Sequence, residues 1–553
     1  MDFVLIYIKA LFSLAEKSAL SLLTVLVTLV ALFLFTPQSS TSSSPPSLND
    51  PIPYVFNTLQ FLFSNDKFTK RALKALKNAR IVKFHLGLKP VYLISGPQCL
   101  QVMFSSRELS YEEIFVRHAF PKFWKFSSEE VEHFARDKSG SGRIPLPGTG
   151  TTPPDQRFWA ARHHVHHDFL GRPNQFKPII DAFGEQFSRM NEKFPLGEWT
   201  TISVINFCKC EVAECAISTL FGPNVLALNP DFLDAFWEFD AVFFNLILGL
   251  PRWITPRPFN AHDRYLSMID RHLTAALEHF DWNGPDAEAL WEPCFGARIC
   301  RELVKWLMEA GFQRPALNGA LGSLLFAQNS NSVPTATWML MELFKDPSLF
   351  QAVREEVATA EVAHSEMHTG KLDVDKLVTL PLLQSIFTET LRLRMSLNII
   401  RTLEDPISLD GIEIAKGSML QAPTMAAHYD EVTWGRPGHP ACQFWAERHL
   451  KYVEERDQTG QVYRKRTFNT SSRPTTFFPF GGGSPICPGR HFAKAEIFTM
   501  VGLMVNRFDI EFVGWTKLDG SPSDRPAEND PRYSAAGSSP PDRDMMIRLK
   551  RKW

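Results

Sequence analysis

The sequence predicts a mainly α-helical protein with a small β subdomain and an N-terminal transmembrane helix. Helical periodicity fills much of the chain and is clearest over about residues 315–344, 373–394 and 491–508. Strand-like runs are fewer and lie at 91–95, 411–423 and 545–551. The third observation is an apolar run without a charge over residues 18–36. These patterns favour a helical body with a minor sheet, tethered at its N-terminus.

The N-terminal region divides into three parts. Residues 1–17 lead into the apolar run 18–36, which is long enough as a helix to cross the roughly 30 Å hydrocarbon core of a bilayer. The alternative is a cleaved signal peptide, but its apolar region is usually shorter, and no A-x-A-like cleavage site follows here. A retained anchor is therefore favoured, although the flanking charges do not set its orientation. Residues 37–53, rich in Ser and Pro, are expected to be a spacer before one folded domain over 54–553.

Composition excludes several classes of protein. The net charge is −1, so no broad basic surface is expected to hold nucleic acid. The 8 Cys in 553 residues are too few for a disulfide scaffold and indicate free thiols in a reducing compartment. The 45 Phe indicate an apolar interior, either as simple core packing or around an apolar pocket.

The most informative stretch is FPFGGGSPICPGR, residues 478–490. Its three consecutive glycines let the backbone take conformations closed to other residues and approach a flat ligand closely. Pro485 and Pro488 stiffen the chain around Cys487, and a helical pattern begins directly afterwards. A thiol just before a helix N-terminus lies near unpaired N–H groups, which favour the thiolate. Because the thiolate is the form that binds metals, Cys487 is the predicted metal ligand.

This stretch resembles the haem-binding signature of cytochromes P-450, F-x-x-G-x-x-x-C-x-G. The matching residues are Phe480, Gly483, Cys487 and Gly489. The resemblance implies the cytochrome P-450 fold for the folded domain and haem b (iron protoporphyrin IX) as the cofactor. It also implies that Cys487 is the axial iron ligand and that Phe480, Gly481 and Gly489 lie against the haem.

Glu389 and Arg392 form a second pattern inside an apolar helical segment. Their spacing places both side chains on one helical face, and a buried pair of this kind needs further hydrogen bonds. The pair is similar to the E-x-x-R motif of the same family. The resemblance implies a third member from a later segment, and Arg448 fits because its planar fork can bond a carboxylate and backbone carbonyls together. We expect this triad to hold the cysteine loop in place, without a chemical role.

The helical segment 315–344 carries polar residues in its middle. Pro334 lacks an N–H, so the carbonyl of Ser330 loses its helical partner, and we expect the helix to open at Ser330 and Asn331. Most members of the family have an acid and a Thr here that relay protons, whereas this chain has Ser330 and Asn331. Asn cannot pass a proton as a hydroxyl can, so Ser332 is the alternative carrier. Residues 330–332 therefore either handle protons or only contact the substrate.

Haem propionates need partners, and the chain departs from the family here. Many members have Arg or His where this sequence has Pro485, which cannot donate a hydrogen bond. The resemblance implies that Arg401 takes over much of this task. Trp159 and Arg162, from an earlier helical segment, are the further predicted propionate contacts.

Three short motifs resemble the sterol 7α-hydroxylase branch of the family, which includes prostacyclin synthase. They lie at 331–338, 396–402 and 486–490. The resemblance implies a monooxygenase that oxidises a bulky apolar substrate (a sterol, terpenoid, related lipid or secondary metabolite) with O2 and NADPH electrons. The implied partners are NADPH–cytochrome P-450 reductase, with cytochrome b5 as a further candidate, and a membrane. The implied location is the endoplasmic reticulum, with a single-pass anchor and a cytosolic catalytic domain. The alternatives are a haem-thiolate isomerase or dehydratase that does not use O2, and a non-catalytic haem-binding protein.

Overall fold

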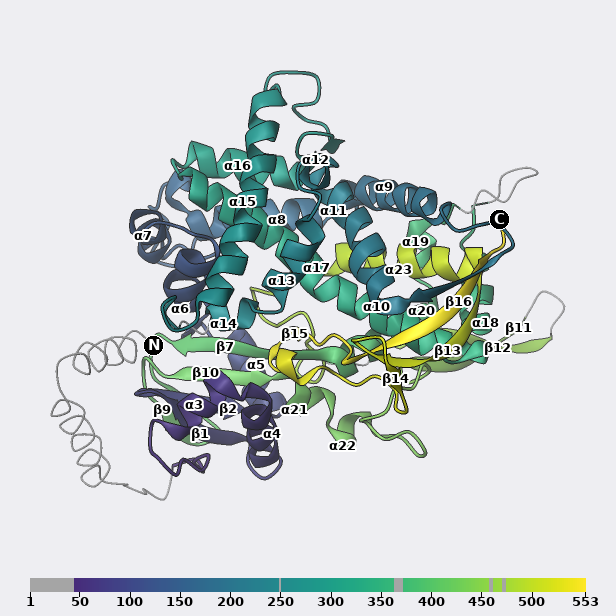
Figure 1. Cartoon of the computed structure of the whole chain (residues 1–553). Helices are drawn as coiled ribbons and strands as arrows, with labels where there is room; N and C mark the ends of the chain where they lie inside the picture. The colour runs from purple at the N-terminus through teal and green to yellow at the C-terminus, as the bar shows by residue number, and fades with distance from the viewer. Residues whose placement is uncertain (1–43, 248–249, 363–370, 457–460, 470–473) are drawn as a thin grey trace.

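The computed structural model describes residues 44–247, 250–362, 371–456, 461–469 and 474–553, and it is mainly helical, as predicted (Figure 1). The principal helices are α3 (Phe56–Phe63), α4 (Asn65–Leu76), α5 (Pro97–Ser105), α7 (Ser128–Arg136), α8 (Phe158–Leu170), α9 (Pro173–Asn191), α11 (Ala213–Phe221), α13 (Phe232–Asp240), α14 (Phe243–Ile247), α15 (Pro256–His279), α16 (Arg298–Glu309), α17 (Arg314–Phe344), α18 (Pro347–Ala358), α20 (Pro381–Arg394) and α23 (Arg490–Arg507). Shorter helical segments are α6 (Glu112–Ile114), η1 (Phe115–Phe123), η2 (Pro154–Gln156), α10 (Val204–Phe207), η3 (Cys208–Val212), α12 (Asn224–Ala227), α19 (Val374–Leu377), α21 (Thr424–His428), α22 (Glu431–Trp434) and η4 (Pro531–Tyr533). One large apolar core joins most of these helices.

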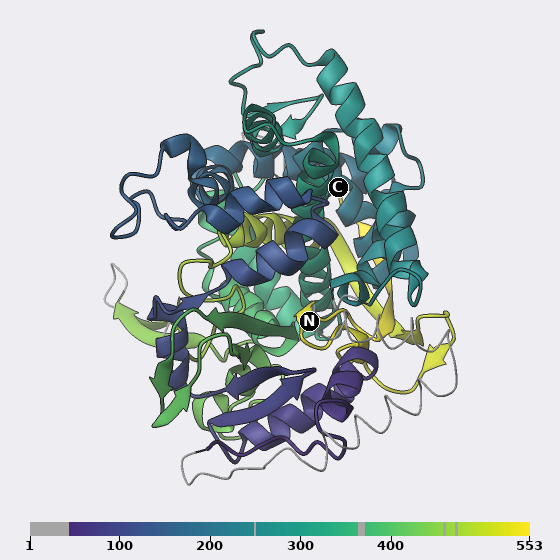
Figure 2. The same cartoon turned by 90° about the vertical axis from the view of Figure 1, so that its left-hand side faces the viewer.

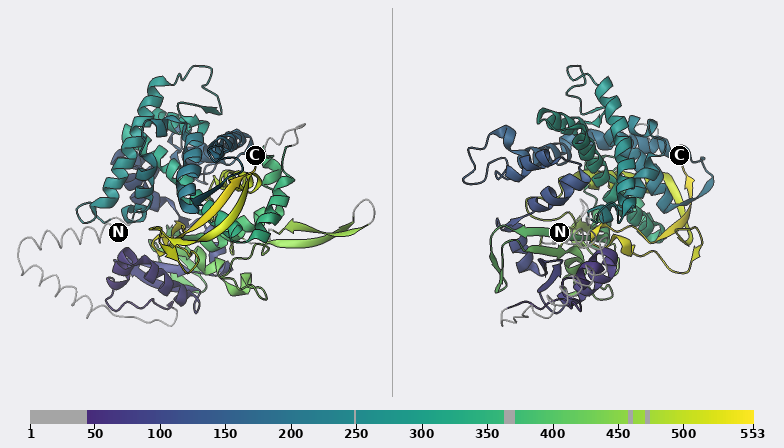
Figure 3. Two further views of the ribbon diagram at one scale, coloured as in Figure 1. Left: turned by 45° about the vertical axis from the view of Figure 1, so that its right-hand side comes forward. Right: turned by 60° about the vertical axis from the view of Figure 1, so that its left-hand side comes forward.

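The largest sheet lies to one side of most helices, where Figure 2 shows the first strands and α3–α4 (purple) beneath the helical part. A six-stranded sheet has the order β1 (Ile81–Leu86), β2 (Lys89–Ile94), β10 (Met419–Pro423), β7 (Met395–Leu403) and β15 (Ala536–Ser538), with β3 (Leu109–Ser110) also paired to β7. A four-stranded sheet has the order β14 (Pro522–Ser523), β13 (Phe508–Lys517), β16 (Arg543–Arg551) and β4 (Trp199–Ser203). Two-stranded sheets pair β5 (Trp291–Glu292) with β6 (Gly296–Ala297), β8 (Ile407–Leu409) with β9 (Ile412–Ile414), and β11 (Leu450–Arg456) with β12 (Val462–Phe468). The β11–β12 hairpin projects from the body (Figure 3). The three predicted strand runs fall in β2, in β9–β10 and in β16.

The long helix α17 matches the predicted segment 315–344, but the predicted opening at Ser330 and Asn331 is wrong. The helix is continuous past Pro334, and it is buried along most of its length. The Thr335 hydroxyl donates to the Asn331 carbonyl at 2.8 Å, which supplies one donor to the turn that Pro334 weakens. Packing on several sides therefore holds the helix together where its own hydrogen bonding is incomplete.

The predicted helical segment 373–394 is two helices, α19 and α20. Pro381 is the first residue of α20, and Leu380 before it has an extended conformation. A proline disfavours the helical conformation in the residue that precedes it and is well suited to the first helical position. The third predicted segment, 491–508, corresponds closely to α23.

The Pro- and Ser-rich stretch 519–542 has the composition of a surface loop, but its last part forms a strand. Residues 536–538 form β15, which pairs with β7 at the edge of the six-stranded sheet. Ser538 and Ser539 are buried at 2% exposure, so this stretch enters the body instead of remaining on the surface.

The predicted anchor 18–36 lies outside the described residues. Among the residues that are described, none of the helices combines the length and apolarity needed to cross a bilayer. The end of the predicted spacer is docked and not free, because Ser47 bridges to Lys83 of β1 and Leu48 is buried at 5% exposure.

Candidate functional site

The loop that precedes α23 is folded by its glycines. Gly481 and Gly483 have φ values of 81° and 73°, which lie in the left-handed region that glycine adopts without strain. A Cβ on Gly482 would come within 2.6 Å of the Phe104 ring, and one on Gly483 within 2.7 Å of the Phe104 carbonyl oxygen. The run of glycines therefore allows the loop to lie directly against α5.

The same loop presents Cys487 at the start of α23. The Cys487 N–H donates to the Phe480 carbonyl at 3.0 Å, which closes the turn. Burial raises the pKa of the Cys487 thiol, whereas the backbone N–H groups of Gly489 and Arg490 and the Arg490 charge lower it. The helix N-terminus thus supplies hydrogen-bond donors that stabilise a thiolate, but the effect of burial on the pKa is larger. The predicted thiolate form therefore requires a cation bound at the sulfur.

The Cys487 side chain is solvent-accessible, yet burial among protein atoms is the main cause of its raised pKa. Both statements hold for a side chain that faces a hollow within the body. Ala327 also has a solvent-accessible side chain, although it lies in the middle of helix α17, which is mostly buried. Phe326 beside it belongs to an aromatic wall with Phe243 and Phe123, with ring centroids 4.2 Å and 5.4 Å from the Phe326 ring.

Two guanidinium groups near Tyr111 lack an anionic partner among the residues that the structure describes. Arg401 is 7% exposed, and within the described part of the chain it donates only to the carbonyls of Ile400 and Gly482, at 2.8 and 2.9 Å. Arg162 stands over the Phe115 ring at 4.4 Å, and its buried Nε has no hydrogen-bond partner within the described ranges. Burial lowers the pKa of both, to about 10 for Arg401. A buried cation without an anion is costly, so this arrangement suits a ligand with negative groups.

Trp159 lies near these cations but has already used its donor. It is 1% exposed, and its indole N–H donates to the Phe134 carbonyl at 2.9 Å. Its ring packs edge-on to Tyr111, with centroids 5.7 Å apart. The predicted hydrogen bond from Trp159 to a propionate would require the bond to Phe134 to break, so this residue contributes packing.

The structure brings the predicted triad together. The Glu389 carboxylate accepts from Arg392 Nε and Nη2 at 2.8 and 2.9 Å, and from Arg448 Nε at 2.8 Å. The backbone N–H of Trp445 and the ring of His449 add contacts at 3.2 Å. Burial alone would raise the pKa of Glu389, but these hydrogen bonds and the two arginine charges outweigh it and lower the pKa to about 2. Arg448 also donates to four backbone carbonyls, those of residues 434, 439, 440 and 443.

His428 connects this triad to the cysteine loop, and the sequence analysis missed it. Arg392 donates to the His428 carbonyl, and His428 Nε2 accepts from the N–H of Phe478 at 3.1 Å. Burial and the Arg392 charge lower the pKa of His428 to about 3, so the ring stays neutral and able to accept. No local pattern marks this residue, because its partners come from two segments that lie far from it in sequence.

The polar run on α17 is tied to its surroundings. Asn331 Oδ1 accepts from the N–H of Ser538 at 3.0 Å, so the carbonyl end of this side chain holds β15. One and two turns later on the same face, Thr335 meets the Ser538 hydroxyl at 3.1 Å, and Trp338 donates to the Ser539 carbonyl at 2.8 Å. Asn331 thus has a docking role, with only its amide NH2 left for a ligand.

The two serines beside Asn331, Ser330 and Ser332, differ in their side-chain contacts. The Ser330 hydroxyl donates to Asp240 at 2.6 Å, and the other oxygen of Asp240 accepts from Tyr533 at 3.1 Å. Ser332 makes no side-chain hydrogen bond to any described part of the chain. Asp240 and Tyr533 were not predicted from the sequence, although the acid at the end of the aromatic run FLDAFWEFD is a local signal for Asp240.

The residues present fit a haem with a thiolate ligand. The donor set is one cysteine sulfur with two backbone N–H groups directed at it, and Arg401 and Arg162, which have no anionic partner among the described residues, can bind carboxylates. A Cβ on Gly489 would lie 4.0 Å from the sulfur, so glycine at this position leaves the space beside the sulfur open.

Comparisons with known proteins agree with this chemistry. The cytochrome P-450 family profile matches residues 45–519. The chain is 41% identical to the cytochrome P-450 monooxygenase calL of Penicillium decumbens over 93% of this chain and 94% of the relative. It is 28% identical to the cytochrome P-450 monooxygenase fsoE of Humicola fuscoatra over 92% of this chain and 88% of the relative. It is also 27% identical to cholesterol 7-alpha-monooxygenase of Cricetulus griseus, over 57% of this chain and 60% of that protein.

A family match over most of the chain, joined to a cysteine loop and cations suited to haem b, identifies this chain as a member of the cytochrome P-450 family, an oxidoreductase of the monooxygenase type.

Proposed function

We propose that this chain is a membrane-anchored monooxygenase that oxidises a bulky apolar substrate, such as a sterol, a terpenoid or a related secondary metabolite. The observation that carries the proposal is the presentation of Cys487 at the start of α23, with backbone N–H groups directed at its sulfur. Haem b, when bound, supplies the activation of O2. Cys487 would hold its iron, and Arg401 and Arg162 would pair with its propionates.

The substrate class follows from the surroundings of Ala327. Phe326, the neighbour of Ala327 in sequence, belongs to an aromatic cluster with Phe243 and Phe123, and an apolar interior of this kind favours a large apolar ligand over a charged one. The names of the relatives support the same class, since they include monooxygenases of fungi and a cholesterol 7-alpha-monooxygenase. Electrons are proposed to come from NADPH–cytochrome P-450 reductase, with cytochrome b5 as a second donor. The apolar run 18–36 supports a single-pass anchor in the endoplasmic reticulum, with the catalytic domain in the cytosol.

One observation favours a second candidate, a haem-thiolate isomerase or dehydratase. The family's usual hydroxyl is replaced by Asn331, whose carbonyl oxygen is bound to the Ser538 N–H. An amide in this position cannot pass a proton as a hydroxyl can. Turnover that is unchanged without NADPH and reductase would favour this alternative over monooxygenation.

The decisive experiment is a reduced carbon monoxide difference spectrum of the full-length protein. The wild type is expected to give the spectrum of a thiolate-bound haem, and Cys487→Ser is expected to abolish it. Cys442→Ser is the matched control, because Cys442 is an exposed free cysteine outside the loop. A thiolate spectrum that survives in Cys487→Ser would refute the proposal. Substrate-induced spectral shifts across a panel of sterols and terpenoids would then identify the substrate class.

A further inference from the structure

Asp240 is a buried acid that has no role in the proposed binding of haem or substrate. It is the last residue of α13 and is 8% exposed. Both of its carboxylate oxygens are held by hydroxyls, one from Ser330 and one from Tyr533. Lys209 acts on it by charge only, without forming an ion pair within the described ranges. A buried carboxyl held by hydroxyls, and not by a cation, is suited to gaining and losing a proton.

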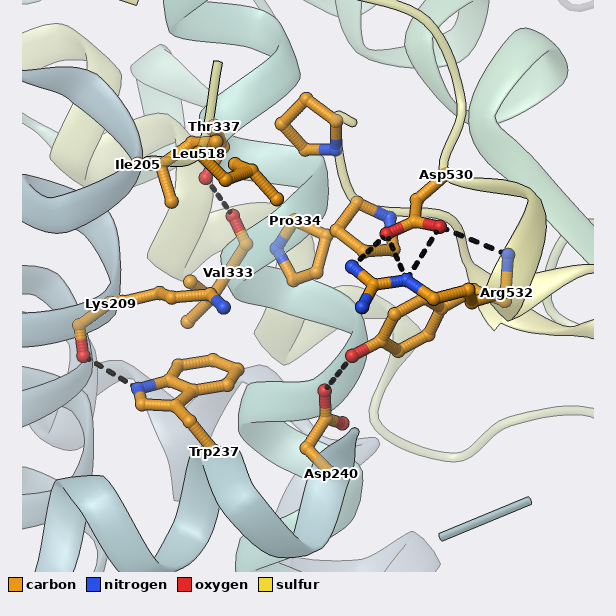
Figure 4. Close-up of a pocket in the computed structure, with 13 residues that line it drawn as sticks. Ile205, Lys209, Trp237, Asp240, Val333, Pro334, Thr337, Leu518, Asp530 and Arg532 are labelled. Atoms are coloured by element: carbon orange, nitrogen blue, oxygen red, sulfur yellow. Dashed lines mark hydrogen bonds and ion pairs between the residues drawn. The ribbon is translucent and has the colours of Figure 1, made fainter. Parts of the chain in front are cut away.

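The same acid borders a pocket beside α17. One wall is formed by Val333 and Pro334 of α17, and Asp240 lies at the edge of the pocket in Figure 4. Arg532, which also lines the pocket, has a side chain that is 70% exposed and is paired with Asp530 at 2.6 Å. The pocket therefore extends from the buried acid to the molecular surface, and its polar residues, Asp240, Tyr533, Asp530 and Arg532, can hold water.

Ser330 connects this acid to the accessible face of α17. It follows the accessible Ala327 by three positions, which is close to one helical turn, and it directly precedes Asn331. Pro334 has no N–H to donate to the Ser330 carbonyl, so this carbonyl lacks its usual helical partner although the helix is continuous. A hydroxyl can accept one proton while it releases another, which neither Asn331 nor Pro334 can do.

We propose that Asp240 is the acid that delivers protons to the reaction side of α17, with the Ser330 hydroxyl as the next carrier. This inference rests on the proposed monooxygenase function. A water molecule in the pocket passes a proton from the bulk solvent to the Asp240 carboxylate: one of its O–H bonds breaks, an O–H bond forms on Asp240, and the water regains a proton from the solvent. The Ser330 hydroxyl, which donates to the Asp240 carboxylate in the structure, then rotates so that its proton points toward the accessible face, and Asp240 donates to Ser330 Oγ as that proton is released. One proton enters and one leaves, no electrons move, and the Ser330 hydroxyl again donates to the Asp240 carboxylate, as in the starting state.

The electrostatic surroundings agree with this role. Burial raises the pKa of Asp240, and the hydrogen bonds from Ser330 and Tyr533 and the charge of Lys209 oppose it without cancelling it. The remaining charges at the pocket, Arg532 and Asp530, largely neutralise each other. A carboxyl with a raised pKa exchanges protons closer to neutral pH than an ordinary Asp does.

The first test uses purified holoprotein and needs no turnover. Infrared difference spectra between two pH values should show a protonated-carboxyl band that titrates above the ordinary range of Asp. The band should vanish in Asp240→Asn and move to higher pH in Ser330→Ala, which loses a donor to the carboxylate. Asp234→Asn is the matched control, because Asp234 is an exposed residue of the same helix. A band that survives in Asp240→Asn, or no band in the wild type, overturns the inference.

The second test measures NADPH-driven oxygen consumption in membranes that contain the reductase. Asp240→Asn is expected to slow consumption by about tenfold or more and to raise the ratio of rates in H2O and D2O, while Asp234→Asn behaves like the wild type. An unchanged rate and isotope ratio in Asp240→Asn overturn the inference. Failure of the proposed function looks different, because the wild type itself would then lack the thiolate-type carbon monoxide spectrum.

Discussion

Replacement of Glu389 by Gln removes one negative charge from a buried site that holds two arginines. The Glu389, Arg392 and Arg448 side chains are all 0% exposed, and three of their hydrogen bonds are 2.8–2.9 Å long. Gln keeps the shape of Glu but leaves both guanidinium groups without a counter-charge in the interior. Breaking a buried ion pair by removing one partner costs about 3–5 kcal/mol.

The pKa of Glu389 leads to a similar magnitude. It is lowered from 4.5 to about 2, which corresponds to about 3 kcal/mol in favour of the ionised native form at ~1.4 kcal/mol per tenfold change. Because the native pKa lies below the unfolded value, this stabilisation is fully present above pH 4.5 and is lost as the pH falls toward 2. For a chain of this length, a loss of this size lowers the melting temperature by roughly 3–4 °C.

The assay is thermal unfolding of the haem-loaded protein at pH 7, together with the lifetime of the thiolate-type carbon monoxide spectrum. Glu389→Gln is expected to melt several degrees lower and to lose that spectrum faster, because the triad reaches the cysteine loop through His428. Glu132→Gln is the matched control. Its pair with Arg136 has the same 2.8 Å length but is exposed, so it should change the melting temperature little. Equal melting temperatures and spectral lifetimes for Glu389→Gln and the control would refute the reasoning.

Three further predictions concern His428, Glu496 and Gly537. His428→Phe removes the acceptor of the Phe478 N–H, so we expect a loss of about 1–3 kcal/mol and faster haem release, followed by absorbance; unchanged haem retention would contradict it. Burial raises the pKa of Glu496 from 4.5 to about 7, so the native state loses stability as the pH rises through this window, by about 3 kcal/mol in all. Glu496→Gln should therefore melt higher than the wild type at pH 8 but not at pH 4, and parallel pH profiles in calorimetry would argue against it. A Cβ on Gly537 would lie 2.6 Å from Asn331 Oδ1, so Gly537→Ala should push β15 away from α17. Amide hydrogen exchange in β15 should then be faster than in the wild type, and unchanged protection would show that this contact does not hold β15 in place.

Much of the site was predictable because its signals are local. The glycines around Cys487, the prolines beside it and the helical pattern that follows are all contained in one short stretch. Glu389 and Arg392 are similarly readable, since a spacing of three residues on a helix places both side chains on one face. Periodicity also located α17 and α23 almost to the residue, because each is long and strongly patterned.

Other features depended on segments that only meet in the folded chain. Asp240 and Ser330 are separated by 90 positions, and Asn331 and Ser538 by 207. The stretch around β15 has the composition of a surface loop, yet its backbone pairs with β7 and its serines are buried. Pro334 should open an isolated helix, but the neighbours packed around α17 keep it continuous.

The difference between the features that the sequence predicts and those that only the folded chain shows has one physical cause. Backbone conformation, helix starts and the charge balance of a short loop depend on neighbours in sequence, so Cys487 and its loop could be read directly from the chain. Which carboxylate faces which hydroxyl depends on how helices and strands pack, and packing minimises buried unpaired polar groups across the whole body. For that reason the partners of Ser330, Asn331 and Phe478 emerged only from the three-dimensional arrangement.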